Sequence, residues 1–207
     1  QPTGAVKGVT NMLMNLKKDS EGSPIIVVFD AKGKTFRSDI YSEYKANRPP
    51  MPDELRDQLI PVKSICRAIG FPLIEIEGVE ADDVIAYATN TALKDSKITI
   101  MSTDKDFYQL VSDRVQMYSP TKKITYDKEL VRKEFGIYPQ NVLTCRVIDG
   151  DRSDSIPGVK GVGIKSLVKE YPELSENKPF DIKMLMDSAK DRETKVSKLI
   201  NNHEYVI

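Results

Sequence analysis

The sequence predicts an α/β fold in which a three-layer, mostly parallel sheet is followed by a smaller helical region. Short β-branched apolar runs at 25–29, 72–76 and 98–101 alternate with amphipathic segments of helical period. Runs of this kind are typical of strands buried in a parallel sheet, and their alternation with helices indicates β-α units. After about residue 135 the strand-like runs end and helix and turn signals take over.

The first part of the chain, residues 1–135, is expected to form the α/β domain. A helix is predicted over 2–16 and a strand over 24–30, whereas the basic segment 31–52 has neither helix nor strand period. Pro52 and the two acids after it mark the start of a helix that stops at Gly70. The remaining expected elements are a strand at 72–77, a helix at 81–94, a strand at 97–102, a short helix at 106–110 and two short strands at 115–119 and 123–126.

The second part, residues 136–207, has the character of a helical region. A helix is predicted over 139–148, and a glycine-rich turn over 156–165 leads into a helix over 165–171. The polar tail 172–207 is expected to be helical in pieces.

Net charge gives no argument for a partner, because 31 basic residues balance 31 acidic residues. The charges are nevertheless segregated along the chain. Between Lys32 and Arg48 five basic residues accompany two acidic ones, and between Gly158 and Lys169 three lysines occur with no acid. Separate basic and acidic segments fit a protein that binds phosphate groups with one surface and metal ions with another.

The cysteines and the histidine narrow the chemistry further. Cys66 and Cys145 lie in predicted helices without metal-ligand spacing, so we expect reduced thiols in the core. The single histidine, His203, makes a histidine-based mechanism or a zinc site improbable. No apolar run reaches the ~18 residues of a membrane span and no signal peptide is recognised, so a cytoplasmic location is expected.

Four acidic groups are the main candidate functional residues, and three of them directly follow a predicted strand. Carboxylates at the ends of neighbouring parallel strands would repel one another unless cations lie between them. The pattern therefore predicts a site for two hard divalent ions. Helix capping could account for one or two of these acids, but three acids within four residues exceed what a cap needs. The candidate metal ligands are Asp30, Glu80, Asp82, Asp83, Asp104, Asp106, Asp151 and Asp154.

Two basic segments are candidate contacts for nucleic acid. The glycine run from Gly158 to Gly163 is not a dinucleotide fingerprint, because it follows a proline loop and not a strand. Its glycines would let backbone N–H groups approach a phosphate, with Lys165 adding charge; a plain tight turn is the alternative. Tyr44, Lys45 and Arg48 would share one face if that segment were helical, and a solvated loop is the alternative.

These motifs, in this order, resemble the 5′-nuclease family of flap endonucleases and 5′→3′ exonucleases. The resemblance is closest to the nuclease domain of bacterial DNA polymerase I and its stand-alone bacterial and phage relatives, and it covers residues 1 to about 170. The matching stretches are Pro2-Thr3-Gly4-Ala5, Val28-Phe29-Asp30, Tyr44-Lys45-x-x-Arg48-Pro49-Pro50-Met51-Pro52, Gly78-Val79-Glu80-Ala81-Asp82-Asp83, Ser102-Thr103-Asp104-Lys105-Asp106, Gly150-Asp151-x-x-Asp154 and Ile156-Pro157-Gly158-Val159-x-Gly161-Val162-Gly163-x-Lys165.

The resemblance implies a PIN-like 5′-nuclease core and specific roles for these residues. The eight acids would hold two Mg²⁺ or Mn²⁺ ions, and the segment 31–52 would form an arch whose catalytic residues are Tyr44, Lys45 and Arg48. A helix-three-turn-helix at about 139–171 would hold duplex DNA, with a K⁺ ion at its loop. The expected DNA contacts are Arg37, Gly158, Val159, Lys160, Gly161, Val162, Gly163 and Lys165.

The implied function is structure-specific, metal-dependent 5′ cleavage of DNA with a 5′ flap, nick or RNA primer during replication and repair. The expected protein is a monomer in the cytoplasm of a bacterium or phage-infected cell, with a fused or separate DNA polymerase as partner. Family members begin with a strand ending in an acidic turn, and this sequence starts after it, so that strand and its aspartate are expected to be missing. A non-cleaving DNA-junction binder is therefore one alternative; a PIN-type ribonuclease, which would lack the arch and the glycine hairpin, is a lesser one.

Overall fold

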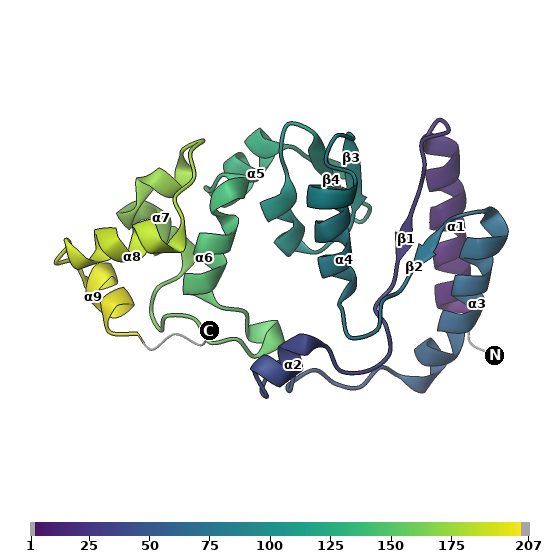
Figure 1. Ribbon diagram of the computed structural model, residues 1–207, viewed down its shortest axis with the longest axis horizontal. Coiled ribbons are helices and arrows are strands. Elements are labelled where there is room, and N and C mark those ends of the chain that lie inside the picture. The colour runs from purple at the N-terminus through teal and green to yellow at the C-terminus, as the bar shows by residue number, and fades with distance from the viewer. Residues whose placement is uncertain (1–2, 204–207) are drawn as a thin grey trace. The chain divides into compact units, whose positions relative to one another are not determined.

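A computed structural model describes residues 3–203, which form two compact units (Figure 1). Unit 1 contains the described residues up to Ser42 together with Arg48–Ile85, and unit 2 contains Glu43–Asn47 together with the described residues from Ala86 onward. The predicted helix start at Pro2 and the end of the predicted polar tail, 204–207, lie outside the described residues. No helix in the described part is both long and apolar enough to cross a membrane.

Unit 1 packs two long helices against a short parallel ladder. β1 (Val27–Val28) pairs with β2 (Leu73–Ile74) in parallel. The helices α1 (Gly4–Asp19) and α3 (Asp53–Ile69) lie side by side next to this ladder (Figure 1). The buried side chains between these elements are Leu13, Val62, Cys66 and Phe71.

The apolar run that predicted β1 is buried on one face. Ile25, Val27 and Phe29 pack against the core of unit 1, whereas Ile26 is 44% exposed. This alternation is the period of two that a strand imposes on its side chains. The ladder is shorter than the predicted strands 24–30 and 72–77 because only two residue pairs meet in register.

The N-terminus of α1 is capped from α3. The side chain of Thr3 makes no cap hydrogen bond, and Gln58 Oε1 instead accepts from the backbone N–H groups of Ala5 at 2.8 Å and Val6 at 3.2 Å. Gln58 Nε2 donates to Glu54 O at 2.8 Å, so this buried amide is satisfied on both sides. This side chain therefore ties the start of α1 to the N-terminal half of α3.

The basic segment 31–52 contains a helix that the sequence did not predict. Residues Phe36–Ile40 form the short helix α2, although we expected no helix anywhere in 31–52. The helix is only five residues long and buries none of them, so it leaves no apolar period to detect. Residues 42–48 form turns and a bend, so the helical arrangement considered for Tyr44 to Arg48 is not present.

Unit 2 begins with a three-stranded ladder. β3 (Ile98–Met101) runs parallel to β4 (Val115–Ser119), which pairs antiparallel with β5 (Ile124–Tyr126). The 3₁₀ helix η2 (Lys105–Leu110) follows β3, where the sequence predicted a short helix. Two of the three strand pairings in the described residues are thus parallel, in keeping with the predicted mostly parallel arrangement.

Two helices depart from the prediction. The expected continuous helix over 81–94 is an α-helix only over α4 (Ala81–Tyr87) and continues as a π-helical turn, η1 (Ala88–Ala92). Helix α5 (Lys128–Phe135) was not predicted. It is marked in the sequence by Asp127, whose side chain accepts from Leu130 N at 2.8 Å, and by Gly136 at φ +76° after its last turn.

The rest of unit 2 is helical (Figure 1), and its elements pack around one apolar core. The core side chains come from most of these helices and from the turn before α7. Cys145 is buried in it, and burial raises the pKa of its thiol to about 12. Cys66 is likewise a buried free thiol, as predicted. The elements are η3 (Pro139–Asn141), α6 (Val142–Asp149), η4 (Arg152–Asp154), α7 (Ile164–Glu170), η5 (Pro172–Ser175), α8 (Ile182–Lys190) and α9 (Lys195–Asn201).

Asn141 is the polar centre of this helical region, and its removal should be costly. Its side chain is fully buried, Nδ2 donates to Leu174 O at 3.1 Å and Lys178 O at 3.0 Å, and Oδ1 accepts from Phe180 N at 2.7 Å. We expect Asn141→Ala to lower the free energy of unfolding by about 3 kcal/mol, because it leaves several buried backbone groups without a partner. Urea unfolding of the variant measures this loss.

The neighbouring residue provides the control for this prediction. Gln140 is exposed and makes one side-chain bond, from Nε2 to Asn177 Oδ1 at 3.1 Å. Gln140→Ala should change the free energy of unfolding by less than ~0.5 kcal/mol. Equal losses for the two variants would show that the amide network of Asn141 does not organise the segment 174–180.

Candidate metal and nucleic-acid site

In unit 1 the acids gather where β2 leads into α4. Glu80 precedes the first residue of α4, is only 6% exposed, and accepts from Thr35 Oγ1 at 3.1 Å. Arg37 donates from both terminal nitrogens to the two carboxylate oxygens of Asp83, and its Nη1 lies 3.9 Å from Glu80 Oε2. The predicted DNA contact Arg37 is therefore placed against two of the predicted metal ligands.

Asp82 lies in the same turn among like charges. Burial raises the pKa of its carboxyl, and the nearby carboxylates of Asp83 and Glu80 raise it further, against the opposing charge of Arg37. One of its oxygens accepts from Asp83 N at 2.8 Å. Asp30 is exposed and accepts from Ala81 N at 2.7 Å, so it caps the start of α4. The unit thus crowds negative charge around one helix start, a setting that a bound cation would stabilise.

In unit 2 two acids flank the start of η2. Asp104 is the last residue of the short segment that links β3 to η2, and it is exposed. Its side chain caps η2 by accepting from Asp106 N at 2.9 Å. Asp106 is half-buried, and burial raises the pKa of its carboxyl, with the charge of Arg146 opposing the shift and that of Asp104 adding to it. Its Oδ1 is buried and receives no hydrogen bond of good geometry from the described residues, although Arg146 Nε lies 2.9 Å away.

The loop after α6 carries the other two acids of this unit. Asp151 accepts from Ser153 N at 2.8 Å and Ser153 Oγ at 2.6 Å, and from a terminal nitrogen of Arg146. Burial acts to raise the pKa of Asp151, but these hydrogen bonds and the charge of Arg146 hold it below its ordinary value. Asp154 lies in η4, and its backbone carbonyl accepts from Lys45 N at 2.9 Å.

The central part of the predicted arch lies against this loop. Residues 43–47 belong to unit 2, and Asn47 Nδ2 donates to Arg152 O at 2.8 Å. Lys45 has a left-handed backbone, φ +58°, and its ammonium lies 4.9 Å from the ring centre of Tyr44. Lys45 thus lies in a turn, and its backbone holds it beside η4. It is not part of a helix, so the helical face considered above is not formed. Arg48, an exposed residue, belongs to unit 1.

The glycine run is packed as a tight turn with exposed lysines. A Cβ atom on Gly158 would lie 2.6 Å from Gly150 N and closer still to Asp149 O, so only glycine fits there. Val159 and Val162 are buried in the core of unit 2, and their backbone N–H groups donate to Ile148 O at 2.7 Å and to Val159 O at 3.0 Å. Gly161 needs glycine for another reason, its φ of +87°. The exposed members of this segment are Lys160, Gly161, Gly163 and Lys165.

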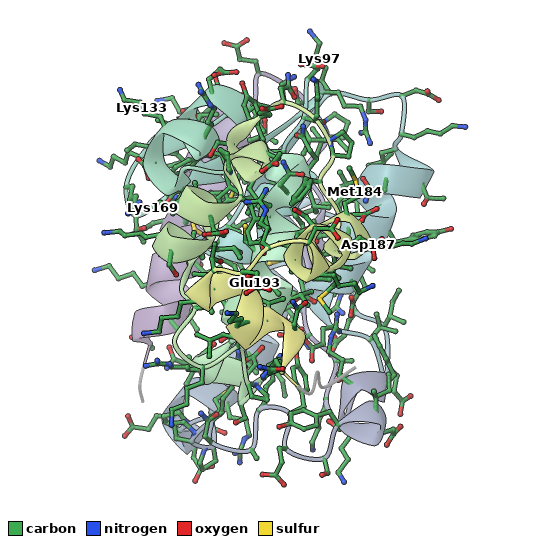
Figure 2. All side chains as sticks on the ribbon, turned by 90° about the vertical axis from the view of Figure 1, so that its left-hand side faces the viewer. Lys97, Lys133, Lys169, Met184, Asp187 and Glu193 are labelled. Carbon is green, nitrogen blue, oxygen red and sulfur yellow. The ribbon has the colours of Figure 1, made fainter. Side chains whose placement is uncertain are left out.

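A further lysine continues this basic surface. Lys169 lies one turn beyond Lys165 on α7, is exposed, and extends away from the ribbon (Figure 2). Lys160, Lys165 and Lys169, with no acid between Gly158 and Lys169, give the turn and α7 exposed positive charges. Such a face can contact phosphate groups without reading bases.

The acids of both units provide only carboxylate oxygens, which suits hard divalent cations. Within residues 3–203, no three acidic, histidine or cysteine side chains converge closely enough to hold a metal ion. Four of the acids are instead paired by arginines: Glu80 and Asp83 by Arg37 in unit 1, and Asp106 and Asp151 by Arg146 in unit 2. The like charges around Asp82 and the buried Oδ1 of Asp106 are the two features of these groups that a cation would compensate.

Comparison with known families decides which class of protein this is. The family model described as "5′-3′ exonuclease, N-terminal resolvase-like domain" matches residues 1–136. The chain belongs to this 5′-3′ exonuclease family. It is 47% identical over 167 residues to DNA polymerase I of Pseudomonas aeruginosa, and the matched region covers 80% of this chain and 18% of the polymerase. It is 43% identical over 174 residues to the 5′-3′ exonuclease of Aquifex aeolicus, and here the matched region covers 82% of this chain and 60% of that protein.

Solved structures of 5′-3′ exonucleases confirm the predicted fold class. A bacteriophage T5 protein crystallised with metal ions is 25% identical, with a TM-score of 0.77 over 97% of this chain and 77% of that one. A T5 5′-exonuclease with bound zinc gives a TM-score of 0.75 at 25% identity, covering 97% of this chain and 76% of that one. The T5 flap endonuclease in a complex with DNA and metal ions has the same fold, with a TM-score of 0.79 at 24% identity, covering 97% and 76%.

The chain spans less than two thirds of these curated relatives' own lengths, 18% of the polymerase and 60% of the exonuclease. Family membership and fold therefore apply to this chain directly. The activity, substrates and partners of the whole relatives do not follow from membership alone.

Proposed function

We propose that this chain is a metal-dependent, structure-specific 5′ nuclease, a 5′→3′ exonuclease and flap endonuclease of DNA replication and repair. The observation that carries the proposal is the crowding of Glu80, Asp82 and Asp83 at the start of α4, in a member of the 5′-3′ exonuclease family. A buried carboxylate beside two others is costly unless a cation or another opposite charge compensates it.

The acids would hold two divalent ions, Mg²⁺ or Mn²⁺. Glu80, Asp82 and Asp104 would serve the tighter ion, and Asp106, Asp151 and Asp154 the second, with Asp30 and Asp83 supporting them. Such ions, when bound, make water acidic enough to ionise near neutral pH and offset negative charge on a phosphodiester. The carboxylates would hold such ions in place and would repel other anions from the site.

The basic residues would place the substrate. Lys45 and Arg48 would offset charge that grows on the phosphate oxygens, and Tyr44 would stack on a base of the 5′ single strand. Arg37 would contact DNA next to Asp83. Lys160 and Lys165, with the backbone of 158–163 and a K⁺ ion, would hold the duplex backbone.

The remaining expectations are part of the same proposal. We propose a nuclease core over residues 1–135 with an arch over 31–52, and a duplex-binding region over 136–207 with a helix-three-turn-helix at 139–171. The substrate would be DNA with a 5′ flap, nick or RNA primer, in the cytoplasm of a bacterium or phage-infected cell. The chain would act as a monomer beside a fused or separate DNA polymerase.

The test is cleavage of an end-labelled 5′-flap duplex by the 207-residue chain, with Mg²⁺ and with EDTA. Cutting near the junction that needs Mg²⁺, with much less cutting of a blunt duplex of the same sequence, would support the proposal. Binding without cutting would favour the second candidate, a DNA-junction binder. The arginine-paired acids, no three of which converge in the described residues, are the observation that favours this second candidate.

A further inference from the structure

Arg146 joins two candidate metal ligands that different elements carry. Its Nε lies 2.9 Å from Oδ1 of Asp106 on η2, and one terminal nitrogen donates to Oδ2 of Asp151 in the loop after α6. The other terminal nitrogen donates to Gly150 O at 3.4 Å. Two guanidinium nitrogens therefore donate hydrogen bonds and the third, Nε, forms an ion pair, while the side chain is only 32% exposed.

The shape of the guanidinium group explains how one residue can hold both acids. It is planar and presents its donors in a fixed fork, so carboxylates on two of its edges take fixed positions relative to each other. A lysine ammonium in the same place would be a point charge on a flexible stem and would not fix that geometry. Ligands already held in place lose less conformational entropy when an ion binds.

We propose that Arg146 is the positioning residue of this carboxylate pair: it holds Asp106 and Asp151 in the arrangement in which they receive the second divalent ion. The inference rests on the proposed function, because it assumes that these two acids bind a metal. It adds a residue that belongs to neither the predicted ligands nor the predicted DNA contacts.

Two other roles for Arg146 lead to different results. If the arginine were only a counter-ion in the place of the metal, its removal would let the metal bind more tightly. If it only stabilised the fold, its replacement would lower the unfolding temperature and leave metal affinity unchanged. A positioning role makes metal binding weaker even when the positive charge is kept, because the fork is lost.

The experiment compares Mn²⁺ binding to the full chain and to Arg146→Lys and Arg146→Gln, by electron paramagnetic resonance of the free ion without DNA. All proteins are measured well below their unfolding temperatures. We expect both variants to weaken the weaker Mn²⁺ site by about tenfold or more, the range found when groups that orient metal ligands are removed. The tighter site should keep its affinity.

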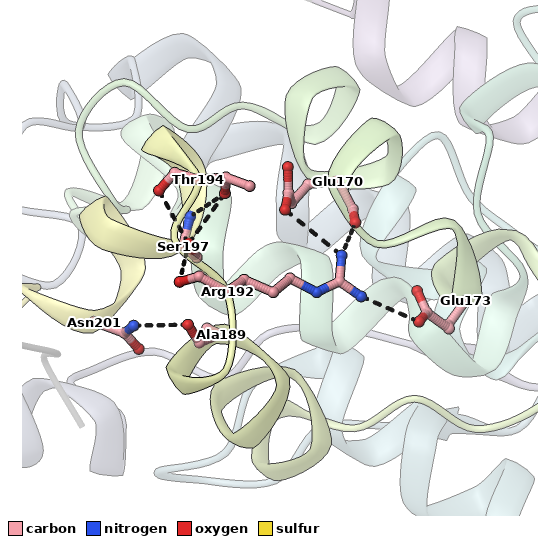
Figure 3. Close-up of polar contacts among 7 residues, drawn as sticks. All are labelled: Glu170, Glu173, Ala189, Arg192, Thr194, Ser197 and Asn201. Atoms are coloured by element: carbon pink, nitrogen blue, oxygen red, sulfur yellow. Dashed lines mark hydrogen bonds and ion pairs between the residues drawn. The ribbon is translucent and has the colours of Figure 1, made fainter.

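Arg192 provides matched control variants. Its guanidinium lies between two acids, 3.6 Å from Glu170 Oε1 and 3.4 Å from Glu173 Oε1, and it also donates to Glu170 O (Figure 3). Its side chain is 30% exposed, close to the value for Arg146. Arg192→Lys and Arg192→Gln should affect folding in the same way as the test variants and leave both Mn²⁺ affinities unchanged.

The outcomes separate this inference from the proposed function. Unchanged affinity in Arg146→Lys, or tighter binding in Arg146→Gln, would overturn the positioning role while leaving a metal-binding nuclease in place. A wild-type chain that binds no Mn²⁺ would overturn both the inference and the two-metal proposal. Weaker binding in the Arg192 variants as well would also overturn the inference, because the effect would then be one of general stability.

Discussion

Replacing Asp104 with alanine is expected to lower Mg²⁺-dependent cleavage of a 5′-flap duplex by on the order of a thousandfold while leaving DNA binding largely intact. Asp104 lies between β3 and η2 and is exposed, so its carboxylate is accessible to an ion. The DNA contacts proposed for Lys160 and Lys165 lie on other elements and keep their charge. Single-turnover cleavage and a gel-shift titration with the same flap measure the two effects.

Asp104 also caps η2, so loss of the cap must be separated from loss of the charge. Asp104→Asn keeps an oxygen that can accept from Asp106 N, now 2.9 Å away, but carries no charge. It should be as stable as the wild type and as inactive as Asp104→Ala. Asp127 is the matched control, because it caps α5 in the same way, at 2.8 Å from Leu130 N. Asp127→Ala should lose about 1 kcal/mol of stability and keep its cleavage. Full activity in Asp104→Asn would remove Asp104 from the metal site.

The strands and most helices could be predicted because their signals are local. The apolar run at 98–101 and the predicted strand at 115–119 coincide with β3 and β4. Gly70, at φ +93°, ends α3 as its position in the sequence indicates. Helix α5 had equally local signals, an aspartate cap and a terminal glycine, and could have been found from Asp127 and Gly136. Helix α2 could not, because five partly exposed residues leave no apolar period.

The acids of the candidate site could be found from the sequence, but their partners could not. Each acid follows a strand or a loop that local patterns reveal. The pairing of Arg37 with Asp83, and of Arg146 with Asp106, joins residues far apart in sequence, and no spacing rule connects them. At Lys45 the loop alternative is the one the structure shows, but its left-handed backbone and the bond to Asp154 that holds it could not be predicted for the same reason. Long-range contacts of this kind depend on packing, which local propensity does not describe.

The second large effect is expected at Gly158, where we predict a loss of stability in addition to any loss of DNA binding. A Cβ atom there would lie 2.6 Å from Gly150 N and closer still to Asp149 O, and both of these are backbone atoms that cannot rotate away. The clash would also separate Val159 N from Ile148 O, which are hydrogen-bonded at 2.7 Å. We expect Gly158→Ala to cost about 3 kcal/mol, or roughly 6–12 °C in Tm, measured by circular dichroism.

Gly163 is the control within the same glycine run. Its backbone has an ordinary φ of −103°, and a Cβ atom there would meet only Asp149 Oδ1 at 3.9 Å. Gly163→Ala should therefore change stability by no more than ~1 kcal/mol, the scale of an N-cap substitution. If the two variants unfold at the same temperature, the close backbone contact between Gly150 and Gly158 is not formed in solution.

The difference between the two glycines also bears on the candidate site. The contact between Gly158 and Gly150 closes the loop that carries Asp151 and Asp154, and the Asp151 and Ile156 backbones pair across it at 2.8 and 2.9 Å. A Gly158→Ala chain that still folds should therefore lose affinity at the weaker Mn²⁺ site, because the loop that orients Asp151 has opened. Gly163→Ala should not, since its position lies outside that loop. A glycine that the sequence marks for contact with phosphate would then act first by shaping the loop of metal ligands.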